Sequence, residues 1–180
     1  MKSKINKYDK IFVAGHNGMV GKAVINKLKE NNFNNLLTIN KDKLDLTNTA
    51  AVKDWFLNNK PDVVIIAAAK VGGIHANNIF PTKFLLDNLK IQNNLIELSW
   101  KNNTSRLLFL GSSCIYPKLS KQPIKEEYLM SGTLEETNKW YAIAKISGIY
   151  LCNALRKEHN FDAISLMPTN LYGPGDNYHP

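Results

Sequence analysis

The stretch VAGHNGMVGKAV, residues 13–24, decides the fold of this chain. Its glycines, Gly15, Gly18 and Gly21, follow an apolar run typical of a buried strand and precede an amphipathic pattern that predicts a helix over residues 19–31. In such a turn the first glycine permits the tight bend, the second lets the backbone approach a phosphate, and the third lets the helix pack on the strand. The helix N-terminus also offers free N–H groups to an anion. The stretch therefore predicts that a dinucleotide diphosphate binds between the first strand and the first helix.

Strand and helix patterns alternate along the rest of the chain. Apolar runs predict strands at residues 10–15, 35–40, 62–69, 106–111 and 162–168, and helical patterns cover residues 49–58, 80–103 and 138–159. Thr47 or Asn48 is expected to cap the second helix. The run at 62–69 is apolar throughout, as expected of a strand that is covered on both faces. This alternation predicts an α/β fold, a Rossmann-type doubly wound parallel sheet with helices on both faces.

Composition and charge exclude several classes of protein. The net charge of +8 comes mostly from scattered lysines, and only Arg106 and Arg156 are arginines, so we expect no nucleic-acid partner and attribute the charge to steering of an anionic substrate. Cys114 and Cys152 form neither a disulfide framework nor a metal-binding pattern, so no metal is expected. No apolar run is long enough to span a membrane and the N-terminus lacks a secretory signal, so we expect a cytoplasmic protein without a membrane partner.

The end of the second predicted strand indicates which dinucleotide binds. NADP-binding proteins place a cation there, against the 2′-phosphate, whereas NAD-binding proteins place a carboxylate. In the sequence TINKDK, Lys41 or Lys43 can meet a 2′-phosphate, and Asp42 supports the competing interpretation. Asp45 and Leu46 follow at a place from which a carboxylate can reach adenine. We therefore expect NADPH, with NADH as the less favoured alternative.

Tyr141 and Lys145 lie four residues apart on the predicted helix 138–159, so their side chains share one face. A tyrosine with an ordinary pKa of about 10 is a poor acid or base at neutral pH, and a nearby ammonium lowers that pKa. Such a tyrosine can donate a proton to a carbonyl oxygen as a hydride arrives, while the lysine holds the nicotinamide ribose. The same spacing occurs in ordinary amphipathic helices with a solvated lysine, but the glycine turn upstream favours the catalytic interpretation.

Two serines and a cysteine follow the fourth predicted strand, in LGSSCIYPK at residues 110–118. A serine at this place can hydrogen-bond a substrate carbonyl beside Tyr141. Cys114 is either an inert buried residue or a thiolate that removes a proton from a carbon next to a ketone. Such a base inverts a stereocentre if a second group returns the proton on the opposite face. This second alternative predicts an epimerase and a reductase in one pocket.

Several stretches of the sequence resemble one known family of enzymes. Besides the glycine turn, they are AAAKVGGI (67–74), FLGSSCIYPK (109–118), TLEETN (133–138), YAIAK (141–145) and MPTNLYGPGDN (167–177). Together they resemble the GDP-L-fucose synthases, which are GDP-4-keto-6-deoxy-D-mannose 3,5-epimerase-4-reductases of the extended short-chain dehydrogenase/reductase superfamily. The glycine turn and YxxxK are shared by that superfamily, whereas AAAKVGG and SSCIYPK are more specific to the fucose synthases.

The resemblance implies an NADPH-dependent conversion of GDP-4-keto-6-deoxy-D-mannose to GDP-L-fucose in nucleotide-sugar biosynthesis. It makes Cys114 the base that epimerises C3 and C5, and Tyr141 the proton donor at the C4 oxygen. Lys145 supports the tyrosine and holds the cofactor, and Ser112 polarises the C4 carbonyl. One alternative is another nucleotide-sugar epimerase or dehydratase of the superfamily, against which Cys114 argues because those often carry threonine there. A second alternative is a non-catalytic dinucleotide-binding module.

The expected cofactor contacts come from the glycine turn and from the resemblance. They are Gly15, His16, Asn17, Gly18, Met19, Val20, Gly21, Lys41, Asp45, Leu46, Ala67, Ala68, Ala69, Leu110, Gly111, Ser112, Ser113, Tyr141, Lys145, Pro168, Thr169, Asn170 and Leu171. Where the family usually has an arginine in the glycine turn, this chain has Asn17, and the second family arginine corresponds to Lys41. The 2′-phosphate therefore has a single candidate cation.

The resemblance also predicts how the chain is organised into domains. Residues 1–172 are expected to form the NADP-binding domain, and residues 173–180 the start of a substrate domain that is largely missing, because family members are much longer. The acid histidine of the family lies beyond the end of this chain and is not His179. A homodimer is expected, paired through the long helices at 80–103 and 138–159.

Overall fold

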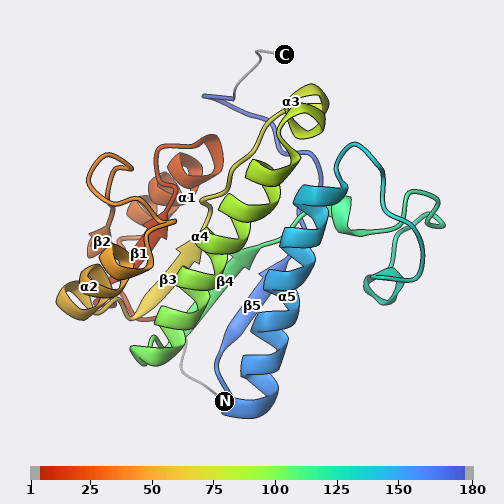
Figure 1. The fold of residues 1–180 in the computed structure, drawn as a ribbon. Helices are drawn as coiled ribbons and strands as arrows, with labels where there is room; N and C mark the ends of the chain where they lie inside the picture. Colours follow the sequence, from red (N-terminus) through yellow and green to blue (C-terminus); the bar gives the residue numbers. More distant parts are fainter. Residues whose placement is uncertain (1–4, 177–180) are drawn as a thin grey trace.

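The computed structural model describes residues 5–176, which form a five-stranded parallel sheet with helices packed against it (Figure 1). The strands are β1 (Ile11–Ala14), β2 (Leu36–Leu37), β3 (Val63–Ile66), β4 (Arg106–Leu110) and β5 (Ala163–Leu166). Their order across the sheet is β2-β1-β3-β4-β5, so the chain moves outward from β1 in both directions. The predicted doubly wound α/β fold is confirmed. Its topological switch point lies between β1 and β3, where sheets of this kind bind ligands.

Within the described residues, five helices and two short 3-10 turns connect the strands. They are α1 (Met19–Glu30), α2 (Thr49–Asn59), α3 (Ile74–Ile79), α4 (Pro81–Lys101), α5 (Lys139–His159), η1 (Ser113–Ile115) and η2 (Glu126–Tyr128). α2 begins as predicted, because the side chain of Asn48 accepts a hydrogen bond from the Ala51 N–H at 3.1 Å. α3 is absent from the sequence prediction, since six residues are too few to display an amphipathic repeat.

Two apolar clusters cover the two faces of the sheet. α2, α4 and α5 pack on one face, where Phe12, Val64 and Phe109 point into the larger cluster. α1 covers the other face over β1 and β3, where Ile11 is fully buried. None of the described helices lies over that second face at β4 and β5, and Leu166 of β5 remains 48% exposed. Both faces are therefore covered at β1 and β3, whereas β4 and β5 are covered on one face.

The parallel register brings the carboxyl ends of the strands to one edge of the sheet. Ala14 pairs with Ile66, and Ile66 pairs with Phe109, so the segments after β1, β3 and β4 begin side by side. β3 ends earlier than predicted. After a last bond from the Ala67 N–H to the Ala14 carbonyl at 2.9 Å, the chain leaves the ladder and turns against the glycine loop.

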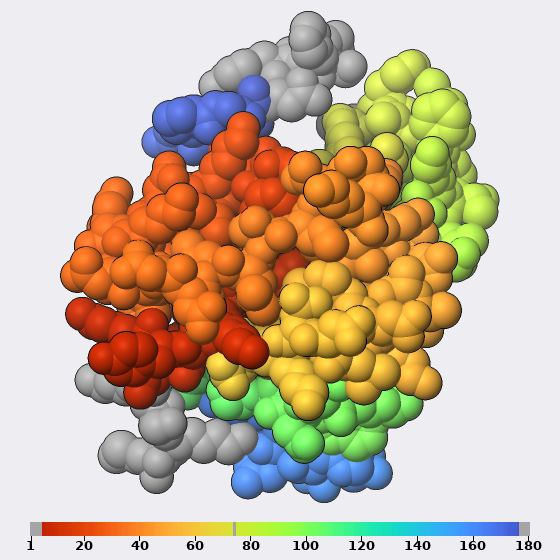
Figure 2. Space-filling model, turned by 90° about the vertical axis from the view of Figure 1, so that its left-hand side faces the viewer, coloured from red at the N-terminus to blue at the C-terminus, as the bar shows by residue number. Residues whose placement is uncertain are grey.

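The segment after β5 lies across the start of α1 (Figure 2). A Cβ atom placed on Gly173 would lie 4.0 Å from the sulfur of Met19, and one placed on Gly175 would lie 4.0 Å from the Lys22 ammonium. The predicted second domain is described only as far as residue 176. His179 lies outside the described residues, and the domain boundary stays a prediction.

Candidate active site

Close packing requires two of the three glycines in the turn after β1. Gly15 has a φ of 86°, and a Cβ there would lie 2.6 Å from the Ala68 nitrogen. A Cβ on Gly21 would lie 2.1 Å from the Gly15 carbonyl oxygen. Gly18 is the N-cap of α1, and α1 has neither a side-chain cap nor an acidic residue in its first turn. The N–H groups at the start of α1 are therefore available to an anion.

A cavity of about 320 Å³ opens at the switch point between β1 and β3. The predicted cofactor residues that line it are Gly15, His16, Asn17, Gly18, Lys41, Asp45, Leu46, Ala67, Ala68 and Ala69. Its other lining residues are Phe12, Ala14, Ile39, Leu44, Thr47, Lys70, Val71, Asp87 and Ile91. The predicted contacts at Met19, Val20, Gly21, Leu110, Gly111, Ser112, Ser113, Tyr141, Lys145, Pro168, Thr169, Asn170 and Leu171 do not line this cavity. The structure thus gathers the residues predicted for the adenosine and diphosphate end of the cofactor in one place.

The loop after β2, which lines part of the cavity, is held by hydrogen bonds from its own residues and from α4. Asp45 accepts bonds from the Thr47 N–H and hydroxyl, each at 2.9 Å, and these bonds lower the pKa of its carboxyl. Asn94 of α4 donates to the Leu46 carbonyl at 2.9 Å and accepts a bond from the Thr49 hydroxyl at 2.9 Å. Thr47 therefore holds the carboxylate that is predicted to reach adenine, and Asn94 holds the backbone of the next residue.

The residues that flank the 2′-phosphate position differ in their placement. Of the three side chains considered there, Lys41 lines the cavity, whereas Asp42 and Lys43 do not. Asn17 donates to the Asn40 side chain at 2.9 Å and so ties the glycine loop to the segment after β2. Where the family carries an arginine, this chain therefore has a neutral amide that is engaged in a bond of its own.

The serine and cysteine segment forms a turn at the carboxyl end of β4. The Ser112 hydroxyl oxygen accepts a hydrogen bond from the Cys114 N–H at 3.3 Å, which caps η1. The Gly111 N–H donates to the Leu166 carbonyl at 2.7 Å, and the Ser113 N–H donates to the carbonyl of Pro168 at 3.0 Å. These bonds bring residues 110–113 and the segment after β5 together, as the predicted nicotinamide side requires.

Lys145 and Tyr141 lie on α5 beside this turn, since α5 packs against η1. Lys145 is 3% exposed, and its ammonium donates to the Leu110 carbonyl at 2.7 Å. The ammonium lies 4.7 Å from the centroid of the Phe109 ring and 5.7 Å from that of the Tyr141 ring. Burial lowers the pKa of Lys145 to about 8.

The pKa of Tyr141 differs from the sequence-based expectation. Burial raises it to about 12, and the negative charge of an ionised Cys114 adds to the rise. The expectation of a lowered pKa is therefore wrong for this structure, because the burial of the phenol and the charge of Cys114 both favour its neutral form. The influence of Cys114 on Tyr141 also places the thiol and the phenol within electrostatic reach. Ser112, Cys114, Tyr141 and Lys145 thus meet at the end of β4.

Buried amides on α4 hold segments of the candidate site, and the sequence analysis does not identify them. Asn88 binds the backbone of Lys70, and Gln92 donates to the Ala144 carbonyl at 2.6 Å, next to Lys145. Asn94 holds the loop after β2 through its bond to the Leu46 carbonyl. Their signal in the sequence is a set of amides that interrupts the apolar face of the predicted helix at 80–103.

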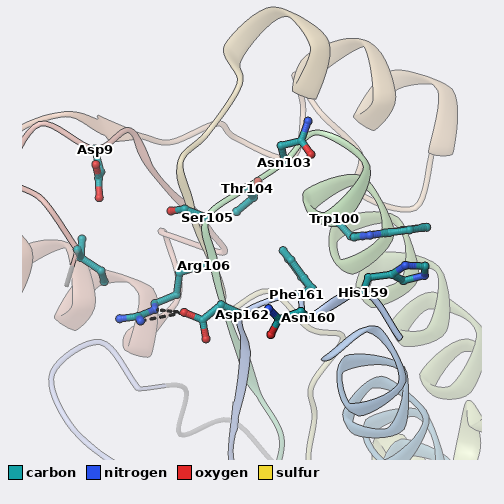
Figure 3. Close-up of a pocket in the computed structure, with 11 residues that line it drawn as sticks. Asp9, Trp100, Asn103, Thr104, Ser105, Arg106, His159, Asn160, Phe161 and Asp162 are labelled. Atoms are coloured by element: carbon teal, nitrogen blue, oxygen red, sulfur yellow. Dashed lines mark hydrogen bonds and ion pairs between the residues drawn. The ribbon is translucent and has the colours of Figure 1, made fainter. Parts of the chain in front are cut away.

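A second cavity, of about 390 Å³, lies at the opposite edge of the sheet, at the amino ends of β4 and β5 (Figure 3). It is lined by Ile5, Asp9, Trp100, Asn103, Thr104, Ser105, Arg106, His159, Asn160, Phe161 and Asp162. Arg106 and Asp162 form an ion pair at 2.8 Å, and the rings of Trp100 and His159 stack with centroids 4.4 Å apart. None of the predicted site residues lines this cavity.

The described part of the chain contains neither a membrane-spanning helix nor a cluster of metal ligands. No helix within residues 5–176 is both long and apolar enough to cross a membrane. Within the same residues, no group of histidine, cysteine and carboxylate side chains has the arrangement of a metal site.

The fold and the cavity at its switch point define the class: an α/β protein built to hold a dinucleotide. Within that class, the family model described as the NAD dependent epimerase/dehydratase family matches residues 11–180, and the chain belongs to this family.

Individual relatives give a narrower likeness. The chain is 56% identical over 178 residues to GDP-L-fucose synthase 1 of Arabidopsis thaliana, a match that covers 99% of this chain and 55% of that protein. A GDP-D-glycero-L-gluco-heptose synthase from Campylobacter jejuni, solved in the presence of NADPH, is 38% identical with a TM-score of 0.94, covering 98% of this chain and 52% of that chain. A GDP-L-fucose synthetase from Naegleria fowleri bound to NADP is 30% identical with a TM-score of 0.87, covering 99% and 55%.

The chain thus spans about half the length of the relatives that it matches. The resemblance to the GDP-L-fucose synthases that the sequence motifs indicate is confirmed by these comparisons.

Proposed function

We propose that this chain carries the cofactor site and the catalytic residues of a GDP-L-fucose synthase. The reaction would epimerise GDP-4-keto-6-deoxy-D-mannose at C3 and C5 and then reduce C4. The observation that carries the proposal is the meeting of Ser112, Cys114, Tyr141 and Lys145 at the end of β4, beside the switch point of the sheet. The cofactor is NADP(H), in agreement with the Naegleria fowleri and Campylobacter jejuni structures, which contain NADP or NADPH.

The reductive half of the reaction uses Tyr141 as an acid. When bound, NADPH would supply the hydride that C4 receives. With a pKa of about 12, Tyr141 holds its proton at neutral pH and can donate it to the C4 oxygen. The Ser112 oxygen accepts the Cys114 N–H, which leaves the serine hydroxyl proton available for the same carbonyl. Lys145 is mostly charged at pH 7 and stabilises the phenolate that remains.

The epimerisation half uses Cys114 as a base. Its side chain is half-buried beside Tyr141, so it is reachable from the site and close to the acid. The thiolate removes a proton from the carbon next to the C4 ketone, and the electron pair moves into an enolate. A second acid then returns a proton to the opposite face of that carbon. The predicted acid histidine would supply this proton, and it belongs to the part of the relatives that this chain does not span.

Substitution of the two groups separates the two halves of the reaction. In a protein that includes the substrate part, Tyr141→Phe should lower NADPH oxidation by about 10²- to 10⁴-fold while exchange of substrate protons with deuterated solvent continues. Cys114→Ser should slow that exchange by a comparable factor. Full reductase activity in Tyr141→Phe would contradict the assignment.

The same experiment distinguishes a second candidate. The likeness to the Campylobacter jejuni heptose synthase favours a related GDP-sugar enzyme. If the unsubstituted protein shows no exchange while Tyr141→Phe abolishes reduction, the protein is a GDP-sugar reductase without epimerase activity. If the unsubstituted protein binds NADPH but shows neither exchange nor reduction, it is a non-catalytic dinucleotide-binding module.

We also propose that two copies pair through α4 and α5. Leu86 on α4 and Ile143 and Tyr150 on α5 are 45%, 38% and 48% exposed, which supports a surface that a second copy could cover. Sedimentation of the chain at two concentrations tests this pairing, and a monomer at both would contradict it.

A further inference from the structure

A short loop after β3, residues 70–73, is held by a buried asparagine of α4. The Lys70 N–H donates to the Asn88 side-chain oxygen at 2.8 Å, and the Asn88 amide donates back to the Lys70 carbonyl at 2.9 Å. The same amide also donates to the Phe84 carbonyl at 2.7 Å. Asn88 is 2% exposed, so these bonds form away from water. They fix both backbone polar groups of Lys70.

A second buried asparagine holds the other end of the loop. Asn77, which is 3% exposed, donates to the carbonyls of Gly72 and Gly73 at 3.0 and 3.2 Å. A Cβ on Gly72 would lie 2.9 Å from the ring of Phe84. The loop therefore has little freedom, although none of its four residues belongs to a helix or a strand.

Lys70 is one of the residues that line the cofactor cavity, together with the glycine loop and Lys41. Among residues 5–176, no hydrogen bond, ion pair or ring contact engages its ammonium. Lys70 is also close to the glycine loop along the chain, because Ala68, two residues before it, packs against Gly15. A rigid loop thus presents an unpaired cation to a cavity that also contains the open N-terminus of α1.

We propose that Lys70 binds the diphosphate of NADPH and that Asn88 is the positioning residue that holds it there. The proposal rests on the proposed function, because it takes the cavity to be the cofactor site. The cavity then divides its cations: Lys41 faces the 2′-phosphate, and Lys70 faces the diphosphate at the start of α1.

The test is a fluorescence titration of the 180-residue chain with NADPH and with NADH. Lys70→Met should weaken binding of both cofactors about tenfold, since both carry the diphosphate. Lys41→Met is the matched control, and it should weaken only NADPH, since NADH lacks the 2′-phosphate. Lys70→Arg retains the charge and should bind both cofactors within about threefold of the original chain.

Any other result of these titrations overturns either the role of Lys70 or the proposed function. Unchanged binding in Lys70→Met, or a loss confined to NADPH, overturns the diphosphate role. A titration with GDP tests whether the diphosphate that Lys70 binds belongs to the sugar nucleotide instead of the cofactor. If Lys70→Met weakens the binding of GDP but not that of NADPH, Lys70 binds the sugar nucleotide and the proposal fails. If the unsubstituted chain binds neither cofactor, the proposed function itself fails, which is a different result from a failure of Lys70 alone.

The positioning role of Asn88 is tested by a double-mutant cycle. Asn88→Ala should weaken NADPH about fivefold in the original chain and less than twofold in the Lys70→Met chain, because it acts through Lys70. Asn94→Ala removes another buried α4 amide and should have the same effect in both backgrounds. If Asn88→Ala behaves like Asn94→Ala, its role is only structural. If Asn88→Ala fails to fold in a thermal melt, Asn88→Ser takes its place in the same cycle, with the same criterion.

Discussion

The two cavities at opposite edges of the sheet have similar volumes, but the polar side chains that line them differ in whether they are paired with one another. At the amino edge, of about 390 Å³, Arg106 pairs with Asp162, and the Thr104 and Ser105 hydroxyls donate to backbone carbonyls at 3.0 and 2.7 Å. At the carboxyl edge, of about 320 Å³, no ion pair among the described residues engages the Lys41 or Lys70 ammonium. Figure 3 shows the paired arrangement at the amino edge. Groups that satisfy one another hold the fold, whereas groups left open at a pocket await a ligand.

The largest effect should come from the glycine turn, which shapes the carboxyl edge. Gly21→Ala places a Cβ 2.1 Å from the Gly15 carbonyl oxygen, and neither backbone can yield without moving α1 from β1. We expect a loss of about 3 kcal/mol or more in the free energy of unfolding, together with loss of NADPH binding. Thermal melts and cofactor titration measure the two effects.

Gly73→Ala is the control for this substitution. Gly73 has ordinary extended backbone with a φ of −64°, and a Cβ there meets nothing within 4 Å. It should change the free energy of unfolding by less than about 0.5 kcal/mol. Equal effects of the two substitutions would show that the turn is not sterically closed.

The second prediction sets the two edges against each other. Arg106→Met leaves the mostly buried carboxylate of Asp162 without its partner and should lower the free energy of unfolding by about 1–3 kcal/mol, with no change in NADPH affinity. Lys41→Met should weaken NADPH binding and leave the free energy of unfolding unchanged, since the Lys41 ammonium is exposed and forms no ion pair among the described residues. Urea unfolding and NADPH titration of both variants give the answer. A change of cofactor affinity in Arg106→Met would break the distinction between the edges.

The third and smallest prediction concerns pH and Lys145. Its pKa is about 8 in the folded chain against an ordinary value of 10.5, so the unfolded chain binds more protons between these values. The cost of burying the ammonium is fully present below pH 8 and disappears as the pH rises towards 10.5. Between about pH 7.5 and 9.5 the original chain should therefore gain about 2 kcal/mol of stability relative to Lys145→Met.

This comparison cancels the other titrating groups, because Tyr141 and Cys152 are present in both chains. Urea unfolding at the two pH values measures the difference. A relative gain near zero would mean that the Lys145 ammonium is better compensated by the Leu110 carbonyl than its burial indicates.

Local sequence patterns predicted most of the fold for identifiable reasons. The strand runs are apolar, and in the sheet Ile11, Val63 and Leu107 are buried to 1% exposure or less. The cap of α2 at Asn48 was visible as a side chain that accepts backbone N–H groups. The helix α3 and the early end of β3 were not visible, because the approach of Ala68 to Gly15 is a contact between segments far apart in the chain.

The candidate site divides in the same way. The residue types of Ser112, Cys114, Tyr141 and Lys145 indicate proton transfer from the sequence alone, because hydroxyl, thiol, phenol and ammonium groups are chemically distinct. The structure brings these side chains together at the end of β4, their catalytic roles stay a prediction, and the pKa of Tyr141 moves in the opposite direction to the one expected. The spacing of Tyr141 and Lys145 shows a neighbour that can lower the pKa of the tyrosine, but it does not show the burial that raises it.

The sequence by itself determined the order of strands and helices, the glycine turn and the kinds of catalytic group, since each depends on residues close together in the chain. Only the tertiary structure decided which polar groups are paired and which face a cavity. The amide of Asn88 interrupts the apolar face of α4 in the sequence, but its partner becomes known only when α4 packs beside β3 and the amide meets the backbone of Lys70. Burial and pairing depend on distant segments brought together, and no local pattern records them.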